Sequence, residues 1–518
     1  MLPTADDTDA LRRDLAAMVS DGRASSDEAD RVAYARDLWP RQQIATRSGI
    51  AAPSPPGVIV WPSSVDEVAA IVRFAASRGV PVVPFGAGSG VCGGVQPEPH
   101  AILLDMKRMR RIVHLDEDRL RCEAQAGIIG QQLEEQLDAR GYTMGHFPSS
   151  IYCSTLGGWI AARSAGQCSG RYGKIEDMVR SLTCVDGRGE VLRASAEGEN
   201  PALLPLVIGS EGTLGVVTDA VVRIAPAPAA RRFASYVFPT TEQGLEAIRH
   251  IYQAGLRPAV ARLYDPFDSM MARRGKGKGK GKGNGPGHVS GRRVGLGSRL
   301  LVRALRRPGM LNRLIEGLSE ETLGGALLVL VWEDEASLAD AEKAEAHALA
   351  LAQGGRDGGE GPARGWLKRR HSVSYRQSPM YAAGAFVDTM EVASTWSRLY
   401  PMYLAVRRAL SPHVFVMAHF SHAYPDGASI YFTFAGSARD DAQAARIYER
   451  AWAEALAAAI DAGGTLSHHH GVGRSKAPAM RREQGAAVDV VRALKSRMDP
   501  HGILNPGSLL PPEDDGAR

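Results

Sequence analysis

A glycine-rich loop between two short apolar segments is the feature that most constrains this chain. Residues 84–95 read PFGAGSGVCGGV, with five glycines in the nine positions from Gly86 to Gly94. Glycine has no side chain to cover the backbone and adopts positive φ without strain, so such a loop leaves its N–H groups open and can wrap closely around a diphosphate. The loop therefore predicts a phosphate-binding site, and a purely structural glycine turn is the alternative.

The GxGxxG pattern inside this loop does not predict a Rossmann fold. A Rossmann loop opens directly into a helix and is followed about 20 positions later by an acidic residue. Here the loop continues through Gly93 and Gly94 toward the apolar segment AILLDM, which we expect to be a strand.

Helix and strand patterns are mixed around the loop. The segment SSVDEVAAIVRFAASRG predicts a helix with Ser64 as its N-cap, Glu67 three residues later and Gly79 as its end. We expect strands in VPVVPF, AILLDM and RLRCEAQAGI, a helix in IIGQQLEEQLDARG, and strand structure again in SLTCVDGRGEVLRAS. This mixture predicts an α+β domain to about residue 228, where APAPAA closes it.

Size and composition narrow the class of protein. A length of 518 residues predicts two or three domains, and a net charge of only +5 does not favour nucleic acid as a partner. The five cysteines include no CxxC pair, which favours reduced thiols in the cytoplasm. The N-terminus MLPTADDTDALRRDL lacks the apolar core of a signal peptide, and no apolar run reaches the length of a membrane span.

Two further segments follow the glycine loop in a recognisable order: PSSIYCSTLGGWIAARS at residues 148–164 and IGSEGTLGVV at residues 208–217. With the loop and the tail segment DPHGILNPG, they resemble the FAD-binding domain of the vanillyl-alcohol oxidase and p-cresol methylhydroxylase (PCMH) superfamily. The resemblance implies an α+β fold with a two-part PCMH-type FAD-binding domain and a cap domain that contains an antiparallel sheet. It implies FAD contacts from Pro84, Phe85, Gly86, Ala87, Gly88, Ser89, Gly90, Ser149, Ser150, Ile151, Tyr152, Cys153, Ser154, Thr155, Ala162, Arg163, Ser164, Ala165, Glu211, Gly212, Thr213, Leu214, Gly215, Val216 and Val217.

The flavin is expected to be non-covalently bound. Relatives that attach the flavin covalently use a histidine or cysteine near these loops, and the glycine loop of this chain has no histidine. Cys153 is the nearest thiol, but it lies close to Gly157 for that role, so a packed cysteine is favoured.

Three consecutive histidines, His468, His469 and His470, stand in the segment TLSHHHGVG. Adjacent side chains diverge by about 100° on a helix and about 180° on a strand, so the triplet does not make a three-ligand metal site. At most His468 and His470 share a side if the segment is extended. A polar turn with incidental histidines is the alternative to a functional triplet.

This segment and HAYPDGASIYFTF at residues 422–434 resemble the alkyldihydroxyacetonephosphate synthases, flavoenzymes that form the ether bond of ether lipids. Those enzymes carry a tyrosine in a GACIYFYF-like strand, matched here by Tyr431, and an SLSHHHGVG segment. Their GHEPDSLEFSTVGGW segment is matched by GHFPSSIYCSTLGGW. The resemblance implies that Tyr431 accepts a proton, that Arg376 binds substrate and that Arg262 supports activity.

The implied reaction exchanges the acyl chain of acyl-dihydroxyacetone phosphate for a fatty alcohol, with no net redox. The three histidines would handle protons near the substrate phosphate, and no metal is implied. The alternative is a D-lactate or glycolate dehydrogenase, but its HxGDGNxH-like and GEHGIG-like segments are not preserved: Tyr431 replaces a histidine and a histidine of the triplet replaces the glutamate. A Cys-Arg pair of the synthases also reads His-Phe-Ser-His at residues 419–422, so the substrate stays open.

Each functional assignment in the second half has a structural alternative. Tyr431 could be a core aromatic residue, Arg376 a surface charge, and Arg262 an ion-pair partner of Asp265.

We expect four segments: a helical preface at 1–52, the FAD-binding domain at 53–228, a cap or substrate domain at 229–437, and a helical C-terminal segment at 438–518 that returns to the FAD domain. A Gly-Lys stretch from Lys276 to Lys282 precedes SRLLVRALRRPGMLNRLIEGL, where Leu300, Leu301, Ala304 and Leu305 would form one side of a short helix and Pro308 would start a second. This region is expected to rest on an anionic membrane surface, with a solvated linker as the alternative. A homodimer stays open.

Overall fold

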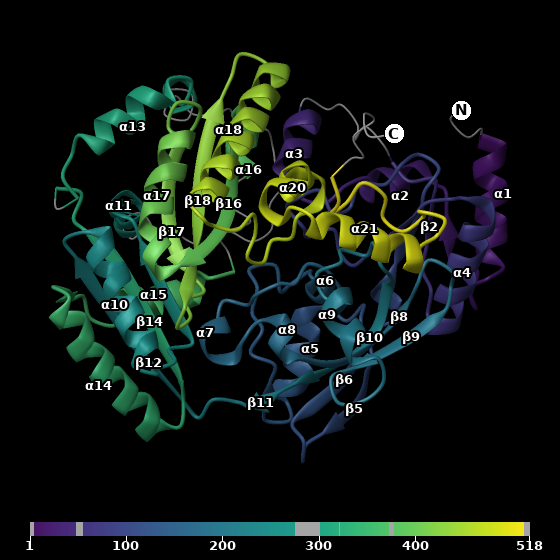
Figure 1. The fold of residues 1–518 in the computed structure, drawn as a ribbon, viewed down its shortest axis with the longest axis horizontal. Helices are drawn as coiled ribbons and strands as arrows, with labels where there is room; N and C mark the ends of the chain where they lie inside the picture. The colour runs from purple at the N-terminus through teal and green to yellow at the C-terminus, as the bar shows by residue number, and fades with distance from the viewer. Residues whose placement is uncertain (1–4, 48–54, 275–300, 321, 372–377, 512–518) are drawn as a thin grey trace, which may run out of the picture. The chain divides into compact units, whose positions relative to one another are not determined.

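The computed structural model describes the chain except for residues 1–4, 48–54, 275–300, 321, 372–377 and 512–518. The chain divides into two compact units (Figure 1). Unit 1 comprises Met1–Ala227 and Leu466–Arg518, and unit 2 comprises Pro228–Thr465. The chain therefore leaves unit 1 once and returns to it.

The first sheet of unit 1 is built around the segments VPVVPF and AILLDM, which form strands as predicted. Its order is β1 (Ala24–Ser25), β2 (Val58–Val60), β4 (Ile102–Asp105) and β3 (Val82–Phe85). Both β2 and β3 pair with β4 in parallel, whereas β1 pairs with β2 antiparallel. Parallel neighbours need a crossover connection, and the predicted helix supplies it.

That helix is α4 (Val65–Arg78), and its ends form where the sequence predicts them. Ser64 Oγ accepts a hydrogen bond from Glu67 N–H at 3.2 Å. Gly79 ends the helix with φ +63°, a conformation that glycine adopts without strain. The apolar face of α4 packs into the core that also contains β2, β3 and β4.

The second sheet of unit 1 is antiparallel and five-stranded. Its order is β5 (Ile112–Asp116), β6 (Arg121–Gln125), β10 (Val216–Arg223), β8 (Val179–Val185) and β9 (Val191–Ser195). RLRCEAQAGI thus gives β6, and SLTCVDGRGEVLRAS gives the β8–β9 hairpin. The two sheets confirm the predicted two-part α+β fold.

Smaller elements complete the first part of unit 1. They are α1 (Ala5–Ala16), α2 (Glu28–Ala33), α3 (Pro40–Thr46), α5 (Gly130–Asp138), β7 (Tyr142–Thr143), α6 (Leu156–Ala161), α7 (Ser169–Tyr172), α8 (Ile175–Met178), α9 (Leu204–Val207) and β11 (Ala225–Pro226). The helical preface is part of the unit's core, because Leu15 and Val19 are buried against the residues of β2 and α4.

The C-terminal part of unit 1 contains α19 (Gly473–Lys476), α20 (Met480–Gln484) and α21 (Ala487–Met498). The tail after α21 then runs beside β3: Val82 N–H donates to Ile503 O at 2.8 Å, and Asn505 N–H donates to Val82 O at 2.9 Å. Lys495 anchors this tail, because its Nζ lies 2.8 Å from Asp499 Oδ2 and also donates to the carbonyls of Thr213 and Leu504.

Unit 2 contains one seven-stranded sheet in which every paired strand is antiparallel, as predicted for the cap domain. Its order is β15 (Arg356–Asp357), β12 (Ala230–Phe238), β14 (Ala326–Asp334), β13 (Val260–Tyr264), β17 (Phe415–Ser421), β18 (Gly427–Ser437) and β16 (Ala385–Thr395). Phe432 on β18 and Phe420 on β17 are buried on the face that packs against Tyr403 of α17. The opposite face of these strands carries polar side chains.

The helices of unit 2 pack around this sheet. They are α10 (Thr241–Gln253), α11 (Pro266–Arg274), α13 (Pro308–Glu316), α14 (Ala336–Ala352), α15 (Gly361–Arg369), α16 (Ser378–Ala382), α17 (Trp396–Leu410) and α18 (Asp441–Asp461). Figure 1 shows α17 and α18 next to β16–β18, with α14 beside β12 at the other end of the sheet. The C-terminal segment expected from residue 438 is thus divided, because α18 belongs to unit 2 and unit 1 resumes at Leu466.

The segment after the Gly-Lys stretch forms two short helical pieces, residues 301–304 and α13, as the Pro308 break predicts. Of the expected apolar side, Leu305 is buried in a small core together with Val302, whereas Leu301 is 49% exposed. Lys276–Lys282 and Leu300 lie outside the described residues. Among the described helices, none is long and apolar enough to cross a membrane.

Replacing Lys495 by methionine should loosen the tail from β3. The change keeps a stem of similar length but leaves the buried Asp499 carboxylate without its cation, a loss that costs roughly 3 kcal/mol for a buried pair. Hydrogen exchange followed by mass spectrometry should show the Val82 amide exchanging about 10²-fold faster. Arg497→Met on the exposed side of the same helix is the control. Equal protection of Val82 in both variants would contradict this role of Lys495.

Candidate functional site

The predicted phosphate-binding loop, residues 86–95, connects β3 to β4 without a helix. Two of its glycines are required by close approach, because a Cβ at Gly86 would overlap Thr155 Oγ1 and a Cβ at Gly93 would overlap the Trp39 ring. In the part of the chain that the structure describes, the amide groups of residues 87–90 donate to no protein acceptor, and these residues are not buried. Open amides in a glycine loop suit an anionic diphosphate, so this loop fits FAD.

Asp37 holds the second half of the loop. Its carboxylate accepts hydrogen bonds from Trp39 N–H at 3.0 Å and Val95 N–H at 3.5 Å, and the neighbouring Leu38 N–H donates to Gly90 O at 2.8 Å. Burial raises the pKa of Asp37 to about 7, against the effect of these backbone donors. The amides of Gly93, Gly94 and Val95 are therefore directed at Asp37, whereas those of residues 87–90 have no acceptor within the described chain.

The first residue of the loop lies next to a cation. Lys107 Nζ donates to Gly86 O at 3.0 Å and lies 2.7 Å from Asp105 Oδ2. This lysine fixes the start of the loop, and it was not among the residues singled out in the sequence.

The second flavin segment turns into α6 at Thr155, whose Oγ1 accepts from Gly158 N–H at 3.2 Å. Behind it lies His146, which is fully buried, with Nε2 2.8 Å from Ser164 Oγ and its ring against Trp159. Burial, and secondarily the charge of His469, lowers the pKa of His146 to about 3. His146 is therefore a neutral imidazole that positions Ser164, one of the residues implied to contact FAD.

Glu211 joins the third flavin segment to the histidine segment. Its carboxylate accepts from the N–H groups of Val472 and Gly473, the latter at 2.8 Å. Burial raises the pKa of Glu211, whereas these donors and the charge of Lys476 lower it. Asn505 of the tail completes the junction, because its side-chain amide donates to Glu211 O at 2.7 Å and to Gly94 O at 2.9 Å.

The histidine segment therefore belongs with the flavin-binding segments of unit 1. Gly473 has φ +54° and lies against Cys92 of the glycine loop, where a Cβ would overlap the Cys92 carbonyl. Within the triplet, His468 Nδ1 and His469 Nδ1 are 3.0 Å apart, and the rings of His469 and His470 cross at 70°. The adjacent rings of His468 and His469 therefore meet through their Nδ1 atoms, although adjacent side chains were expected to diverge.

Unit 2 brings polar side chains from four strands into one row. Tyr431 on β18 lies opposite Glu391 on β16 and His419 on β17. His419 in turn lies opposite Tyr264 on β13. Opposed residues share a face, and Arg262 shares it too because it is two positions before Tyr264. We call these five residues the polar row.

Tyr431 is half-buried and hydrogen-bonded to His422, with 2.9 Å between Oη and Nε2. Burial and the charge of Glu391 raise the pKa of Tyr431 well above its ordinary value, and the charge of Arg262 opposes them. The phenol is therefore protonated at neutral pH. A proton can move between Tyr431 Oη and His422 Nε2 without a water molecule between them.

Arg262 contacts His419, with 2.6 Å between Nη2 and the ring Nε2. Burial and the charge of Arg262 hold the pKa of His419 well below its ordinary value, so the imidazole is neutral. Its Nε2 accepts from the guanidinium and its Nδ1 faces Asp268 Oδ2 at 3.4 Å. Arg262 Nε is buried and has no hydrogen-bond partner within the described chain.

The proposed ion pair between Arg262 and Asp265 is wrong. Asp265 accepts instead from Arg407 at 3.0 Å and from Ala418 N–H at 2.9 Å. Arg376 lies outside the described residues.

Sequence reasoning missed several residues of these two sites. Asp268 and Glu391 lie in no motif, and their roles depend on which strands and helices become neighbours. His146 lies in the matched segment GHFPSSIYCSTLGGW, but the sequence alone assigned it no role of its own. His419 and His422 were visible as a departure from the synthase pattern, but nothing local in the sequence shows that one contacts an arginine and the other a tyrosine.

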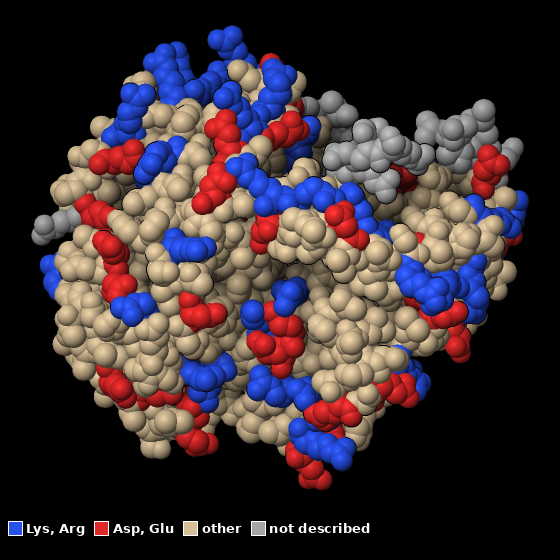
Figure 2. Space-filling view, viewed as in Figure 1, with Lys and Arg blue, Asp and Glu red and all other residues tan. Residues whose placement is uncertain are grey.

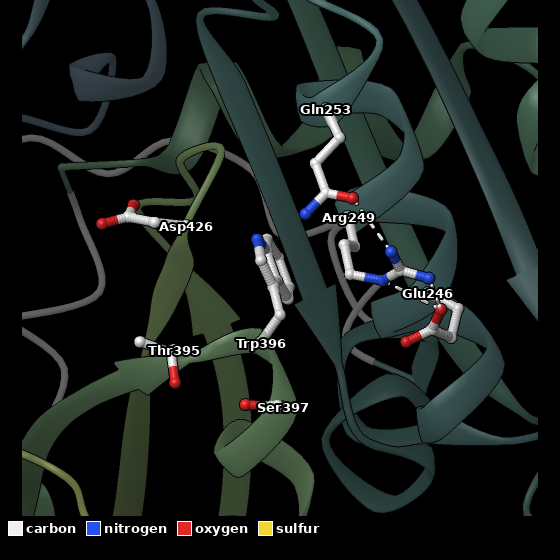
Figure 3. A pocket seen from close by; sticks show the side chains of 7 residues that line it. All are labelled: Glu246, Arg249, Gln253, Thr395, Trp396, Ser397 and Asp426. Atoms are coloured by element: carbon white, nitrogen blue, oxygen red, sulfur yellow. Dashed lines mark hydrogen bonds and ion pairs between the residues drawn. The ribbon is translucent and has the colours of Figure 1, made fainter.

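Unit 2 also has a separate pocket of about 470 Å³ (Figure 3). The indole of Trp396 stands beside Arg249, which is bound to Glu246 and Gln253. The pocket contains no residue of the polar row.

Two known protein families match this chain. A family described as FAD binding domain matches residues 56–195, and one described as FAD linked oxidases, C-terminal domain, matches residues 227–509. FAD is therefore the cofactor that unit 1 holds.

Individual proteins are also similar to this chain over most of its length. The alkyldihydroxyacetonephosphate synthase of Trypanosoma brucei brucei is 29% identical over 92% of this chain and 76% of its own length. The glycolate oxidase subunit GlcD of Bacillus subtilis is 26% identical over 93% of each chain. A solved structure of alkyldihydroxyacetonephosphate synthase matches with a TM-score of 0.74 and 26% identity over 96% of this chain and 84% of that one. Since the second family match alone spans more than half of its residues, the chain belongs to the FAD-linked oxidases.

Proposed function

We propose that this flavoenzyme is an alkyl transferase that exchanges the acyl chain of acyl-dihydroxyacetone phosphate for a fatty alcohol. The C1–O bond to the acyl group breaks, a C1–O bond to the alcohol forms, and a carboxylate and a proton leave, so there is no net redox. The observation that carries the proposal is the hydrogen-bonded pair of Tyr431 and His422 beside Arg262 on the polar row. The synthases among the relatives support the same choice.

Tyr431 is the residue that takes the proton from the substrate carbon. Its raised pKa means that the phenol must first transfer its own proton, and His422 Nε2 at 2.9 Å is positioned to receive it. The positive charge of Arg262 lowers the energy of the resulting phenolate, which is how a tyrosine with an ordinary pKa near 10 becomes a useful base.

Arg262 and Arg376 bind the substrate phosphate. A guanidinium offers forked donors that match a phosphate, and Arg262 keeps its Nε–H unused within the described chain. The contact from Arg262 to neutral His419 takes only part of the fork. Asp268 beyond His419 keeps this histidine in one tautomer and so fixes the direction of the guanidinium.

Unit 1 holds FAD through the open amides of residues 87–90 and the segments around Thr155 and Glu211. Bound FAD would supply an electrophilic ring that stabilises the substrate carbon while the acyl group is replaced. His468, His469 and His470 supply donors that hold or move protons, and Glu211 fixes their segment through Val472 and Gly473.

A second candidate is oxidation of a 2-hydroxy acid, which the similarity to the glycolate oxidase subunit favours. Anaerobic reduction of the flavin separates the two functions. A hydroxy-acid dehydrogenase bleaches its flavin anaerobically with lactate or glycolate, whereas the transferase need not. The deciding experiment incubates the protein with acyl-dihydroxyacetone phosphate and labelled hexadecanol. Labelled ether product supports the transferase, and anaerobic bleaching without ether product supports the dehydrogenase.

Replacing Tyr431 by phenylalanine should lower turnover by roughly 10² or more while FAD stays bound, because a general acid–base group contributes on that scale. His422→Gln should also lower turnover, since it removes the group that receives the phenol proton. Both are measured as kcat for labelled ether formation at matched flavin content. Tyr400→Phe on α17, against the opposite face of the sheet, is the control. Full turnover in Tyr431→Phe would refute the assignment.

Arg262→Lys and Arg376→Lys each keep the charge and lose the fork. We expect each to weaken binding of the phosphorylated substrate by about 1–3 kcal/mol, seen as a higher KM. Arg249→Lys, in the separate pocket of unit 2, should leave KM unchanged. If the parent protein used the phosphorylated and dephosphorylated substrates equally well, the phosphate role would be excluded.

FAD should leave the protein when the protein is denatured. No histidine lies in the glycine loop, and Cys153 Sγ faces the Ser150 carbonyl at 3.4 Å. After acid precipitation, the yellow colour should stay in the supernatant, and Cys153→Ser should bind FAD as the parent does. Colour retained in the washed pellet would establish a covalent link.

A further inference from the structure

Helix α13 of unit 2 packs Leu311 against the small core of Val302 and Leu305, yet it buries a polar residue and leaves two large apolar residues exposed. Its polar residue Asn312 is 1% exposed and binds the strand beneath it: the side-chain amide donates to Ser411 O at 2.9 Å and Val414 O at 2.8 Å, and its oxygen accepts from Val416 N–H at 3.3 Å. Asparagine is usually exposed, and here three hydrogen bonds compensate for its burial. The helix is therefore fixed with a chosen side outward.

The outward side is apolar. Met310 is 63% exposed and Leu314 is 69% exposed, and Leu318 just beyond the helix is 43% exposed. Residues four apart lie above one another on a helix, so Met310 and Leu314 form one ridge. Leu301 in the preceding helical turn, 49% exposed, adds a fourth apolar side chain. Four large apolar residues within 18 positions are more than scattered surface residues require.

Arginines surround these residues. Residues 301–318 contain four arginines and one glutamate, a net charge of +3, and Arg303, Arg306, Arg307 and Arg313 are all exposed. The single Glu316 faces Arg407 at 3.6 Å and accepts from Ser411. Figure 2 shows Lys and Arg side chains gathered along the edge of unit 2 where α13 lies, at the upper left. We call residues 301–318 the basic apolar patch.

We propose that the basic apolar patch binds the surface of an anionic lipid bilayer. Met310, Leu314 and Leu318 would insert among the upper acyl carbons, and the surrounding arginines would contact lipid phosphates. An apolar ridge bordered by cations is the arrangement that interfacial helices use, since apolar burial and electrostatic attraction add.

A second copy of the chain is a poorer partner for the same patch. Two copies meeting through it would bring two clusters of net charge +3 together, and like charges across an interface are strongly unfavourable. A lipid surface instead supplies both the negative charge and the apolar interior that the patch lacks. The inference does not depend on the substrate proposed above.

The test uses the full-length flavin-loaded protein and vesicles of phosphatidylcholine alone or with about 30% phosphatidylglycerol, an anionic fraction that gives a surface potential of the size found on cellular membranes. We expect co-sedimentation with the anionic vesicles at low ionic strength and release at high ionic strength, because screening weakens surface attraction. Arg306→Gln combined with Arg307→Gln should lower the partition coefficient by roughly 10- to 30-fold. Leu314→Asp should lower it by about 10-fold.

The control variants make the same types of substitution outside the basic apolar patch. Leu338→Asp replaces a leucine that is 48% exposed on α14, and Arg119→Gln with Arg193→Gln removes two exposed arginines from unit 1. Both should bind vesicles as the parent does, and flavin content and circular dichroism verify that every variant is folded. The proposal is overturned if the parent binds neutral and anionic vesicles equally, if the controls lose as much binding as the patch variants, or if Leu314→Asp instead dissociates a dimer.

Discussion

Unit 1 depends on the hydrogen bonds between β3 and the C-terminal tail. Val82 donates to Ile503 and accepts from Asn505, so residues more than 400 positions apart close one sheet edge. Asn505 then binds both the glycine loop and Glu211, and Glu211 holds the backbone after the histidine triplet. The shape of the glycine loop and the position of the histidines therefore both depend on the same tail.

In unit 2, the register of the strands determines which polar side chains meet. His419 stacks on Tyr431 and contacts Arg262 only because β18, β17 and β13 pair with the observed alignment. A shift of one residue would turn Tyr431 into the apolar face now occupied by Phe432 and would bury a phenol without its histidine. The large aromatic residues of the apolar face thus also fix the chemistry of the polar face.

The sequence predicted what is encoded locally. Helix α4 formed between Ser64 and Gly79 because both end signals act within a few residues, and the glycine loop could be identified because its composition alone leaves the backbone open. The contact of Arg262 with His419 could not be predicted, because it joins residues 157 positions apart and depends on strand order. The exposed residues of α13 were equally hidden: the sequence does not show that Leu311 packs inward whereas Met310 and Leu314 stay exposed.

The discontinuity of unit 1 also constrains the order of events during synthesis. By the time the ribosome completes Ala227, both sheets of unit 1 have been made, but the strand-like tail that closes β3 is still almost 280 residues away. All of unit 2 must emerge first, and it can fold on its own because its strands pair only with one another. The nascent glycine loop therefore lacks its Asn505 partner until all of unit 2 has been made, so this loop reaches its final hydrogen bonding only after unit 2 has emerged.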